Sequence, residues 1–582
     1  MIAFLLHGFY ASFIAFFLSW IFGGLSAGVA VVSILVGAIF ALKHAKLLQA
    51  QTSGLTLKAF SSGMAGMLEA LIIVFTMYVC WRHFLYLFFE REGAWYTLNP
   101  NNFGDLPLHI SYIRAFAEGL PFPPVNPGFG TEILRYPFGV DLYDALWEIL
   151  GVPLRAHLLA VGMMCALGTL IVLRWFGGWW AMGAFFLSGG WLGWNVVTGS
   201  APLYDIQGAV EWKNMLLSVF ITQRGVMFGL PLGLILLELV RREFSDETTL
   251  TRPVKTILGF IWGILPFYHA HFFVIVSLLM GALAINGRGL RGLKDLLLSR
   301  MALIAYLPAT YFVLRTSGGF KKANIVHWDW WWAGESKTAA TFMWTNFGVW
   351  LLLPVAIAVC LVVMKNRFSQ VQRRRLWGEL FIALACFALF FNLMLAPWNW
   401  DNIKILIWPY LLIARLGWVV VEPCFRHSVG RLFRIPVAAV LFFSGFLMIA
   451  YSLRAPSEVA LSLYPFVDLG QAEGALASVP KNAKFLAAPT HDHALTYFGR
   501  VRIIGHGGHL WSHAIDYQDV WDRHEAVMAG REDWLKLAKD LGATHIYWGP
   551  HERARYGLER KPWADTLKDV SRVPEVSIYE IP

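Results

Sequence analysis

The chain has 582 residues, 57% of them hydrophobic and only 15% charged, and its mean hydropathy is +0.54. This composition excludes a soluble globular enzyme and indicates a polytopic membrane protein. The formal net charge of +10 requires no nucleic-acid partner, because Lys and Arg gather in a few loops between apolar segments.

Apolar windows of the length that crosses a bilayer, roughly 20 residues, recur along the chain. They predict an α-helical polytopic membrane protein with about 13 spans. The windows lie at residues 3–22, 25–43, 63–88, 156–174, 176–195, 223–240, 256–267, 270–286, 301–316, 346–364, 377–396, 403–421 and 435–452. The stretch 256–286 is too short for two full spans, so we expect a bent or half-inserted hairpin there.

Basic residues lie on one side of the membrane under this assignment. They cluster at 43–58, 241–255, 288–300, 365–375 and 426–434. Cytoplasmic loops are enriched in Lys and Arg, so this side is predicted to be the cytoplasm.

The opposite side receives the outer loops 90–155, 196–222 and 317–345, together with residues 397–402. We therefore predict a multi-span domain over 1–454 and an extracytoplasmic domain over 455–582. The predicted location is the plasma (inner) membrane.

The first outer loop contains the most distinctive polar residues. Asp105 and His109 follow an apolar window and precede a proline-rich run at 121–127. If residues 106–116 are helical, His109 lies one turn from Asp105 on the same face, and it is a candidate substrate-binding residue. Asp105 is then a candidate base for an acceptor hydroxyl, or a metal ligand. The alternative, which is compatible with catalysis, is a helix N-cap followed by Pro107.

The second outer loop supplies two acids and two cations. Asp205 and Glu211 are candidate catalytic acids, and Lys213 and Arg224 are candidate ligands for a phosphate. The alternative is an interfacial belt that anchors the helix ends.

Polar residues also interrupt the later apolar windows. His269 and His271 lie inside the 256–286 hairpin, and Asp401, Asn402 and Lys404 lie at the outer end of a span. Such residues are costly in a membrane unless they face a polar cavity, so all five are candidate substrate-binding residues. The histidines could instead cap broken helix ends, and a metal site would need a third ligand.

The last segment alternates short β-rich and helical patterns. Strands are predicted at 484–489, 543–548 and 576–581, and amphipathic helices at 519–529 and 532–541. This alternation predicts an α/β domain with a largely parallel sheet.

Three histidines, His506, His509 and His513, recur at a spacing that suits a metal. Gly507 and Gly508 favour a loop at this position instead. No cofactor follows from the sequence with certainty, and a divalent cation stays an open alternative.

Two groups of residues carry a resemblance to a known superfamily. The first is Gly104-Asp105, the run 123–130 and the pattern L-x-YPFG-x-D from Leu134 to Asp141. Together with the many spans, it resembles the membrane GT-C glycosyltransferases, which use polyprenyl-phosphate-linked sugars. The second is the segment 542–553, which resembles the endings of a poorly characterised prokaryotic branch of that superfamily.

The resemblance implies a catalytic base on the first outer loop, which maps onto Asp105. It also implies a second acid on a later outer loop, and Asp205 and Glu211 are both open for that role. The neighbour of Asp105 is Leu106 rather than a second acid. This departure from the family pattern leaves metal dependence open.

These residues predict an inverting glycosyltransferase at the outer face of the membrane, moving a hexosyl or pentosyl group. The donor is a polyprenyl-phosphate-linked sugar whose lipid lies among the spans and membrane lipid, and the acceptor is a glycan, a lipid or a protein. Asp105 takes the acceptor proton, and Arg224, Lys213 or Lys404 holds the phosphate charge. The alternatives are a transporter or lipid flippase and a non-catalytic scaffold, in which Asp105→Asn would be silent.

Overall fold

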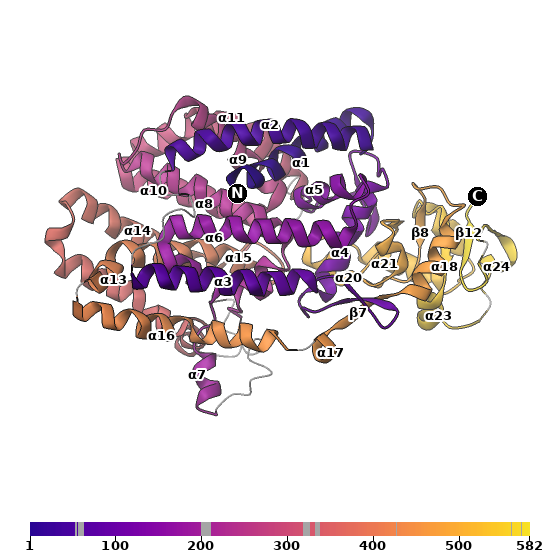
Figure 1. Ribbon diagram of the computed structural model, residues 1–582. Coiled ribbons are helices and arrows are strands. Elements are labelled where there is room, and N and C mark those ends of the chain that lie inside the picture. Colours follow the sequence, from indigo (N-terminus) through magenta and orange to yellow (C-terminus); the bar gives the residue numbers. More distant parts are fainter. Residues whose placement is uncertain are drawn as a thin grey trace. The chain divides into compact units, whose positions relative to one another are not determined.

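The computed structural model is mostly helical and describes residues 1–52, 55, 63–199, 211–317, 326–331, 338–426, 428–454, 456–559, 561–571 and 573–582. Figure 1 follows the chain from its indigo N-terminus to its yellow C-terminus. The chain divides into two compact units. Unit 1 comprises Met1–Phe9, Ile39–Arg82 and Val161–Ala455, and unit 2 comprises Tyr10–Ala38, His83–Ala160 and Pro456–Pro582.

Eight helical stretches in the described part of the chain are long and apolar enough to cross a membrane. They are α1 (Ile2–Phe22), α2 (Ala27–Gln51), α3 (Met64–Leu85), α6 (Leu154–Phe186), α10 (Ala270–Leu297), Ala339–Val363 with α12 (Ala339–Phe347) and α13 (Leu352–Val363), Asp401–Phe425 with most of α15 (Asn399–Leu416), and Leu432–Ser452 within α16 (Ser428–Ser452). These stretches confirm a multi-pass membrane protein.

Four further predicted windows are helices that fall short of this criterion. They are α8 (Arg224–Phe244), α9 (Arg252–Tyr268), α11 (Arg300–Thr316) and α14 (Gln370–Phe390). Helices α9 and α11 have only 17 residues each, and α8 and α14 contain several charged side chains. The total of about 13 spans therefore stays a prediction.

The prediction that the stretch 256–286 is too short for two full spans agrees with its first helix and is wrong for its second. Helix α9 has 17 residues. Helix α10 extends from Ala270 to Leu297, with a break at Arg288 and Gly289, which leave helical geometry. This α10 stretch is long and apolar enough to cross a membrane. The break between the two helices falls at His269, where the sequence predicts it.

Helix α6 covers the predicted window 156–174 and the window 176–195 as far as Phe186, and its break falls within three residues of the point that separates these windows. Gly177 and Gly178 leave helical geometry, and Gly178 has φ +57°. A Cβ on Gly178 would lie 2.5 Å from the Trp418 ring, so only glycine fits this close approach.

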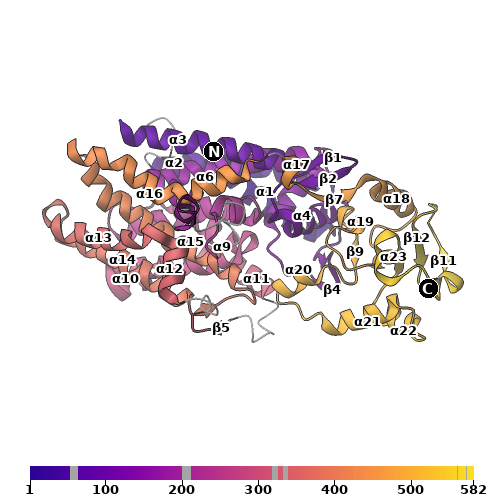
Figure 2. The same cartoon turned by 90° about the horizontal axis from the view of Figure 1, so that it is seen from below.

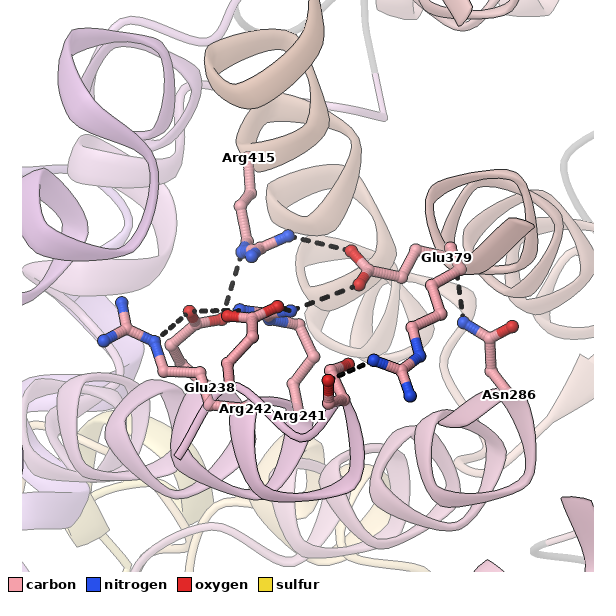
Figure 3. Close-up of polar contacts among 9 residues, drawn as sticks. Glu238, Arg241, Arg242, Asn286, Glu379 and Arg415 are labelled. Carbon is pink, nitrogen blue, oxygen red and sulfur yellow. Dashed lines mark hydrogen bonds and ion pairs between the residues drawn. The ribbon is translucent and has the colours of Figure 1, made fainter. Parts of the chain in front are cut away.

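A network of buried charges joins α8, α14 and α15 in unit 1 (Figure 3). Glu238 accepts hydrogen bonds from the Nε atoms of Arg241 at 2.8 Å and Arg415 at 3.0 Å. Glu379 accepts from Arg415 at 2.8 Å and pairs with Arg241 at 3.5 Å. All four side chains are at most 6% exposed. Two carboxylates and two guanidinium groups balance, so these helix ends pack without an isolated charge.

Unit 2 contains a five-stranded sheet in the order β11-β12-β10-β8-β9. Its strands are β8 (Lys484–Leu486), β9 (Val501–Arg502), β10 (His545–Trp548), β11 (Lys568–Asp569) and β12 (Ser577–Glu580). Strands β9, β8 and β10 are parallel, but β12 runs antiparallel to both β10 and β11. Two of the four strand pairings are parallel and two are antiparallel, so the sheet is mixed rather than largely parallel.

Helices α21 (Gln518–Met528) and α22 (Trp534–Asp540) are present as predicted and lie next to each other in Figure 2. Both contribute to a buried core with Trp563, Leu486 and Ile546. The other helices of the tail are α17 (Pro456–Val459), α18 (Phe466–Leu476), α19 (Ala494–Tyr497), α20 (Gly507–Ser512), α23 (Pro550–Tyr556) and α24 (Trp563–Thr566).

The first outer loop is part of the same unit as the C-terminal tail. Its hairpin β1 (Phe89–Arg91) and β2 (Ala94–Thr97) pairs with β7 (Leu461–Pro465). Its second hairpin, β3 (Val125–Asn126) and β4 (Phe129–Ile133), lies against β9, where the amides of Arg502 and Gly505 each donate at 2.8 Å to the carbonyls of Pro127 and Gly128. Two segments more than 300 residues apart thus share backbone hydrogen bonds.

We expect Glu238→Gln to destabilise the protein by about 3–5 kcal/mol, because Arg241 and Arg415 both lose a buried counter-charge. The two guanidinium groups then share Glu379, and the remaining charges no longer balance. Thermal unfolding of the detergent-solubilised protein measures the change. The matched control is Arg523→Gln, which breaks the surface ion pair with Asp519 and should change stability little. Equal effects of the two variants would contradict a stabilising role for the buried network.

Candidate functional site

Asp105 lies in the first turn of helix α4 (Asn102–Ala117). The helix covers the predicted segment 106–116, and its N-cap position is Asn101, not Asp105. The alternative prediction, that Asp105 is the N-cap residue, is therefore wrong. An acid in the first turn is still favoured by the helix dipole. The Asp105 side chain is half-buried.

His109 is buried and bound to an acid from the next helix. Its Nδ1 lies 2.8 Å from Oδ1 of Asp141, which is in the first turn of α5 (Gly139–Glu148). Asp141 belongs to the L-x-YPFG-x-D pattern, so that pattern supplies a partner for α4. The Tyr136 ring of the same pattern lies 5.9 Å from the His109 ring. The sequence does not indicate this pairing, because 32 residues separate the partners.

A small pocket in unit 2, here called the histidine pocket, lies beside α4. It is lined by His491, His506, His509 and His513, with Tyr112 and Thr496 among the other lining residues. His509 Nε2 lies 3.0 Å from the carbonyl oxygen of Gly104. Asp105 follows Gly104 in the chain. The candidate base is therefore next to a residue whose backbone carbonyl contacts a pocket histidine.

Burial disfavours the charged form of three of the pocket histidines. It lowers the pKa of His491, His506 and His509 below the usual value of about 6.5, and the neighbouring histidines and Arg502 add to this effect. The Arg502 guanidinium is itself buried, and its Nη1 donates to the carbonyl of Thr490 at 2.8 Å. Neutral imidazoles can donate one hydrogen bond and accept another. The pocket therefore offers polar contacts with little fixed charge.

The three histidines at 506, 509 and 513 lie partly on a helix. Gly507 and Gly508 begin α20, so the loop predicted here is wrong. Across the described ranges, no three His, Cys, Asp or Glu side chains are arranged to hold a metal ion.

A second polar group lies in unit 1, where α9 ends and α10 begins. His269 is extended between the helices (φ −159°, ψ 104°), and its Nδ1 accepts from the Phe272 amide at 3.3 Å. The capping role predicted for these histidines is thus confirmed for His269. A Cβ on Gly225 would lie 2.0 Å from the Tyr268 carbonyl oxygen. The buried residue Arg224 at the start of α8 is therefore close to this break.

The start of α15 adds an ion pair to this group. Asp401 and Lys404 are both buried and bound to each other. Lys404 lies within electrostatic range of His269 and His271. We call Arg224, His269, His271, Asp401 and Lys404 the unit-1 polar cluster. The sequence predicts each of these residues separately as substrate-binding, and the fold brings them together.

Asn402 has a different environment from its neighbours. Its Nδ2 donates to the carbonyls of Phe390 and Leu393 at 2.8 and 2.7 Å, and its Oδ1 accepts from the Leu395 amide at 3.0 Å. These bonds stabilise the turn between α14 and α15. They leave little capacity for a ligand, so we assign Asn402 a structural role.

The structure describes residues 196–199 and 211–222 of the second outer loop, and Asp205 lies outside the described residues. Glu211 is exposed and Lys213 is half-buried. Between them, the buried Trp212 donates its amide to Oδ1 of Asn346 at 2.7 Å. This bond holds the end of the loop, where Glu211 is accessible to solvent.

The tail motif around Glu552 is structural. Its Oε1 accepts from the Ala488 amide at 2.6 Å and lies 2.9 Å from His493 Nε2, and its Oε2 accepts from the Gly549 amide at 2.8 Å. The fully buried Glu552 thus ties the start of α23 to the end of β8. Its position beside a Gly-Pro helix start is the signal that could have predicted this role.

Comparisons with known proteins locate no family. No family model matches the chain, and no curated protein matches its sequence. Among solved structures, the chain is similar to the oligosaccharyltransferase of Archaeoglobus fulgidus in its apo form, with 11% identity over 86% of this chain and 72% of that chain, at a TM-score of 0.41.

The same archaeal enzyme tethered to an acceptor peptide containing the NVT sequon is 12% identical over 83% of this chain and 69% of that chain, at a TM-score of 0.37. Both TM-scores lie below 0.5. We therefore take neither fold nor activity from this likeness and base the functional proposal on the chain's own residues.

We expect the protein to lose stability as the pH falls below about 6.5. The unfolded chain protonates its histidines there, whereas the depressed pKa values keep His491 and His506 neutral in the folded state. The upper limit is about 1.4 kcal/mol per histidine and pH unit. Thermal unfolding at pH 7.5 and 5.5 measures this loss, which should be smaller in His491→Gln/His506→Gln. His551→Gln is the control, and an unchanged pH dependence in the double variant would contradict the assignment.

Proposed function

We propose that this protein is a membrane glycosyltransferase that transfers a sugar from a polyprenyl-phosphate-linked donor to an acceptor at the outer face of the plasma membrane. One observation carries the proposal: an acid in a helical first turn, Asp105, adjoins a residue whose carbonyl contacts a pocket of neutral polar side chains. The resemblance of residues 104–141 to GT-C enzymes agrees with this proposal.

The reaction needs one base and a stabilised leaving group. The acceptor oxygen attacks the anomeric carbon while the bond from that carbon to the phosphate oxygen breaks, and the electron pair leaves with the phosphate. The Asp105 carboxylate takes the acceptor proton. A single displacement of this kind inverts the anomeric configuration. His109 does not share the proton with Asp105 in this scheme, because its Nδ1 is engaged by Asp141.

The donor phosphate requires cations in a site sheltered from water. Within the unit-1 polar cluster, Arg224 and Lys404 are buried cations close to the break between α9 and α10. Asp401 partly balances this charge, since it is paired with Lys404. We propose that Arg224 and Lys404 bind the phosphate. Glu211, which is exposed, and Asp205 are the two open choices for a second acid.

We expect Asp105→Asn to reduce transfer by about 10²–10⁴-fold, because the amide cannot accept the proton. The assay uses a panel of radiolabelled polyprenyl-phosphate sugars with membrane extracts as acceptors, at equal expression of each protein. The matched control is Asp522→Asn. Asp522 is an exposed acid that accepts a hydrogen bond from Gln518. Full transfer by Asp105→Asn would move the base elsewhere, with Asp205 and Glu211 tested next.

Arg224→Gln and Lys404→Gln should each raise the KM for the donor by about tenfold to a hundredfold, because each removes a charged hydrogen bond worth about 1.5–3 kcal/mol. Initial rates at varied donor concentration measure the change, and thermal unfolding checks that each variant is folded. Lys365→Gln, at an exposed position in the 3₁₀ helix Lys365–Arg367, is the control. An unchanged KM in both variants would exclude the unit-1 polar cluster as the phosphate site.

A further inference from the structure

The histidine pocket contains polar atoms that the protein itself does not satisfy. Among the residues that the structure describes, the Tyr112 hydroxyl, the Thr496 hydroxyl and Nε2 of His491 are buried without a hydrogen-bond partner. All three residues line the pocket. Tyr112 and Thr496 are almost fully buried, whereas the four histidines are half-buried.

Such atoms are rare in folded proteins, and they cluster here. Most buried polar atoms have a partner, because an unpaired one loses its bonds to water and gains nothing in return. Buried polar side chains elsewhere in the described chain differ: Asn402 makes three hydrogen bonds to backbone, and the Glu552 carboxylate is held by two amides and His493. The Tyr464 hydroxyl and the Trp408 indole nitrogen lack a partner, but they are scattered and line no shared pocket with the three atoms above. Three unsatisfied atoms around one pocket therefore point to a ligand.

The chemistry of these atoms selects the class of ligand. A hydroxyl can donate one hydrogen bond and accept others, and a neutral imidazole offers one donor and one acceptor. Groups of this kind complement a ligand whose own groups are both donors and acceptors, as the hydroxyls of a sugar are. The His513 ring lies 4.6 Å from the Tyr136 ring, and adjoining rings of this kind offer an apolar surface to the C–H face of a sugar.

An anion fits the pocket less well. Burial lowers the pKa of His491, His506 and His509, and Nη1 of Arg502, which also lines the pocket, donates to the carbonyls of Ala488 and Thr490. A phosphate or carboxylate would have to compete with those carbonyls for the Arg502 guanidinium. A peptide would need a longer groove, whereas this pocket is small.

We propose that the histidine pocket binds a single uncharged sugar ring, the acceptor end of a carbohydrate, through Tyr112, Thr496 and His491. This proposal rests on the proposed function in one respect, because it assigns the acceptor of that reaction to the carbohydrate class. Binding itself does not require transfer.

The test is saturation-transfer NMR on the full chain in lipid nanodiscs, with methyl glucoside, methyl galactoside and methyl mannoside as probes. We expect saturation transfer to at least one glycoside, and binding at least tenfold weaker in Tyr112→Phe/Thr496→Val. This variant removes two hydroxyls and keeps both side-chain shapes. The matched control is Tyr579→Phe/Thr566→Val, which makes the same substitutions in unit 2 outside the pocket lining. Thermal unfolding confirms that both variants are folded.

Two additional measurements separate this proposal from the proposed function. Asp105→Asn should still bind the glycoside, because Asp105 is not among the lining residues. If no glycoside binds while transfer is observed, the sugar pocket is wrong and the glycosyltransferase stands. If binding is unchanged in Tyr112→Phe/Thr496→Val, or if inorganic phosphate displaces the glycoside, the assignment of the pocket is overturned.

Discussion

Polar groups removed from water must find partners inside the protein, and this constraint organises both units. In unit 1, Glu238 and Glu379 are balanced by Arg241 and Arg415, and the four charges join three helices. In unit 2, the buried pair of His109 and Asp141 joins α4 to α5. A charge left alone in either place would cost more than the packing around it supplies.

The same constraint explains why the first outer loop and the C-terminal tail form one unit. A strand at the edge of a sheet has free amides and carbonyls, and β9 is such a strand in the tail. The loop covers it by accepting hydrogen bonds from Arg502 and Gly505. Helix α4 is thereby held beside α20, through the contact of His509 with the Gly104 carbonyl. The candidate base and the pocket belong together because of this pairing.

The histidine pocket brings three buried polar atoms without a hydrogen-bond partner into one lining. The capping of α10 by His269 and of α23 by Glu552 shows how local breaks in helices are repaired. Around the pocket, the hydroxyls of Tyr112 and Thr496 have no hydrogen-bond partner in the protein. A binding site is the usual place for polar groups that lack a protein partner, because the ligand supplies the missing bonds.

Local patterns in the sequence were sufficient for the individual elements. The apolar windows predict the long helices because each window reports only the solvent of its own segment. The helix from 519 to 529 and the break at His269 follow equally from short-range periodicity and polarity. The L-x-YPFG-x-D pattern and Asp105 indicated a site, but not how its parts are joined.

By itself, the sequence determined that this is a multi-span helical protein with polar residues at the ends and breaks of its helices, since composition and periodicity are properties of neighbouring residues. Only the tertiary structure decided which of those residues meet. It paired His109 with Asp141, gathered the unit-1 polar cluster from three helices, and turned β12 antiparallel to β10. These outcomes depend on contacts between distant segments, and such contacts are set by packing and by the pairing of buried polar groups rather than by local pattern.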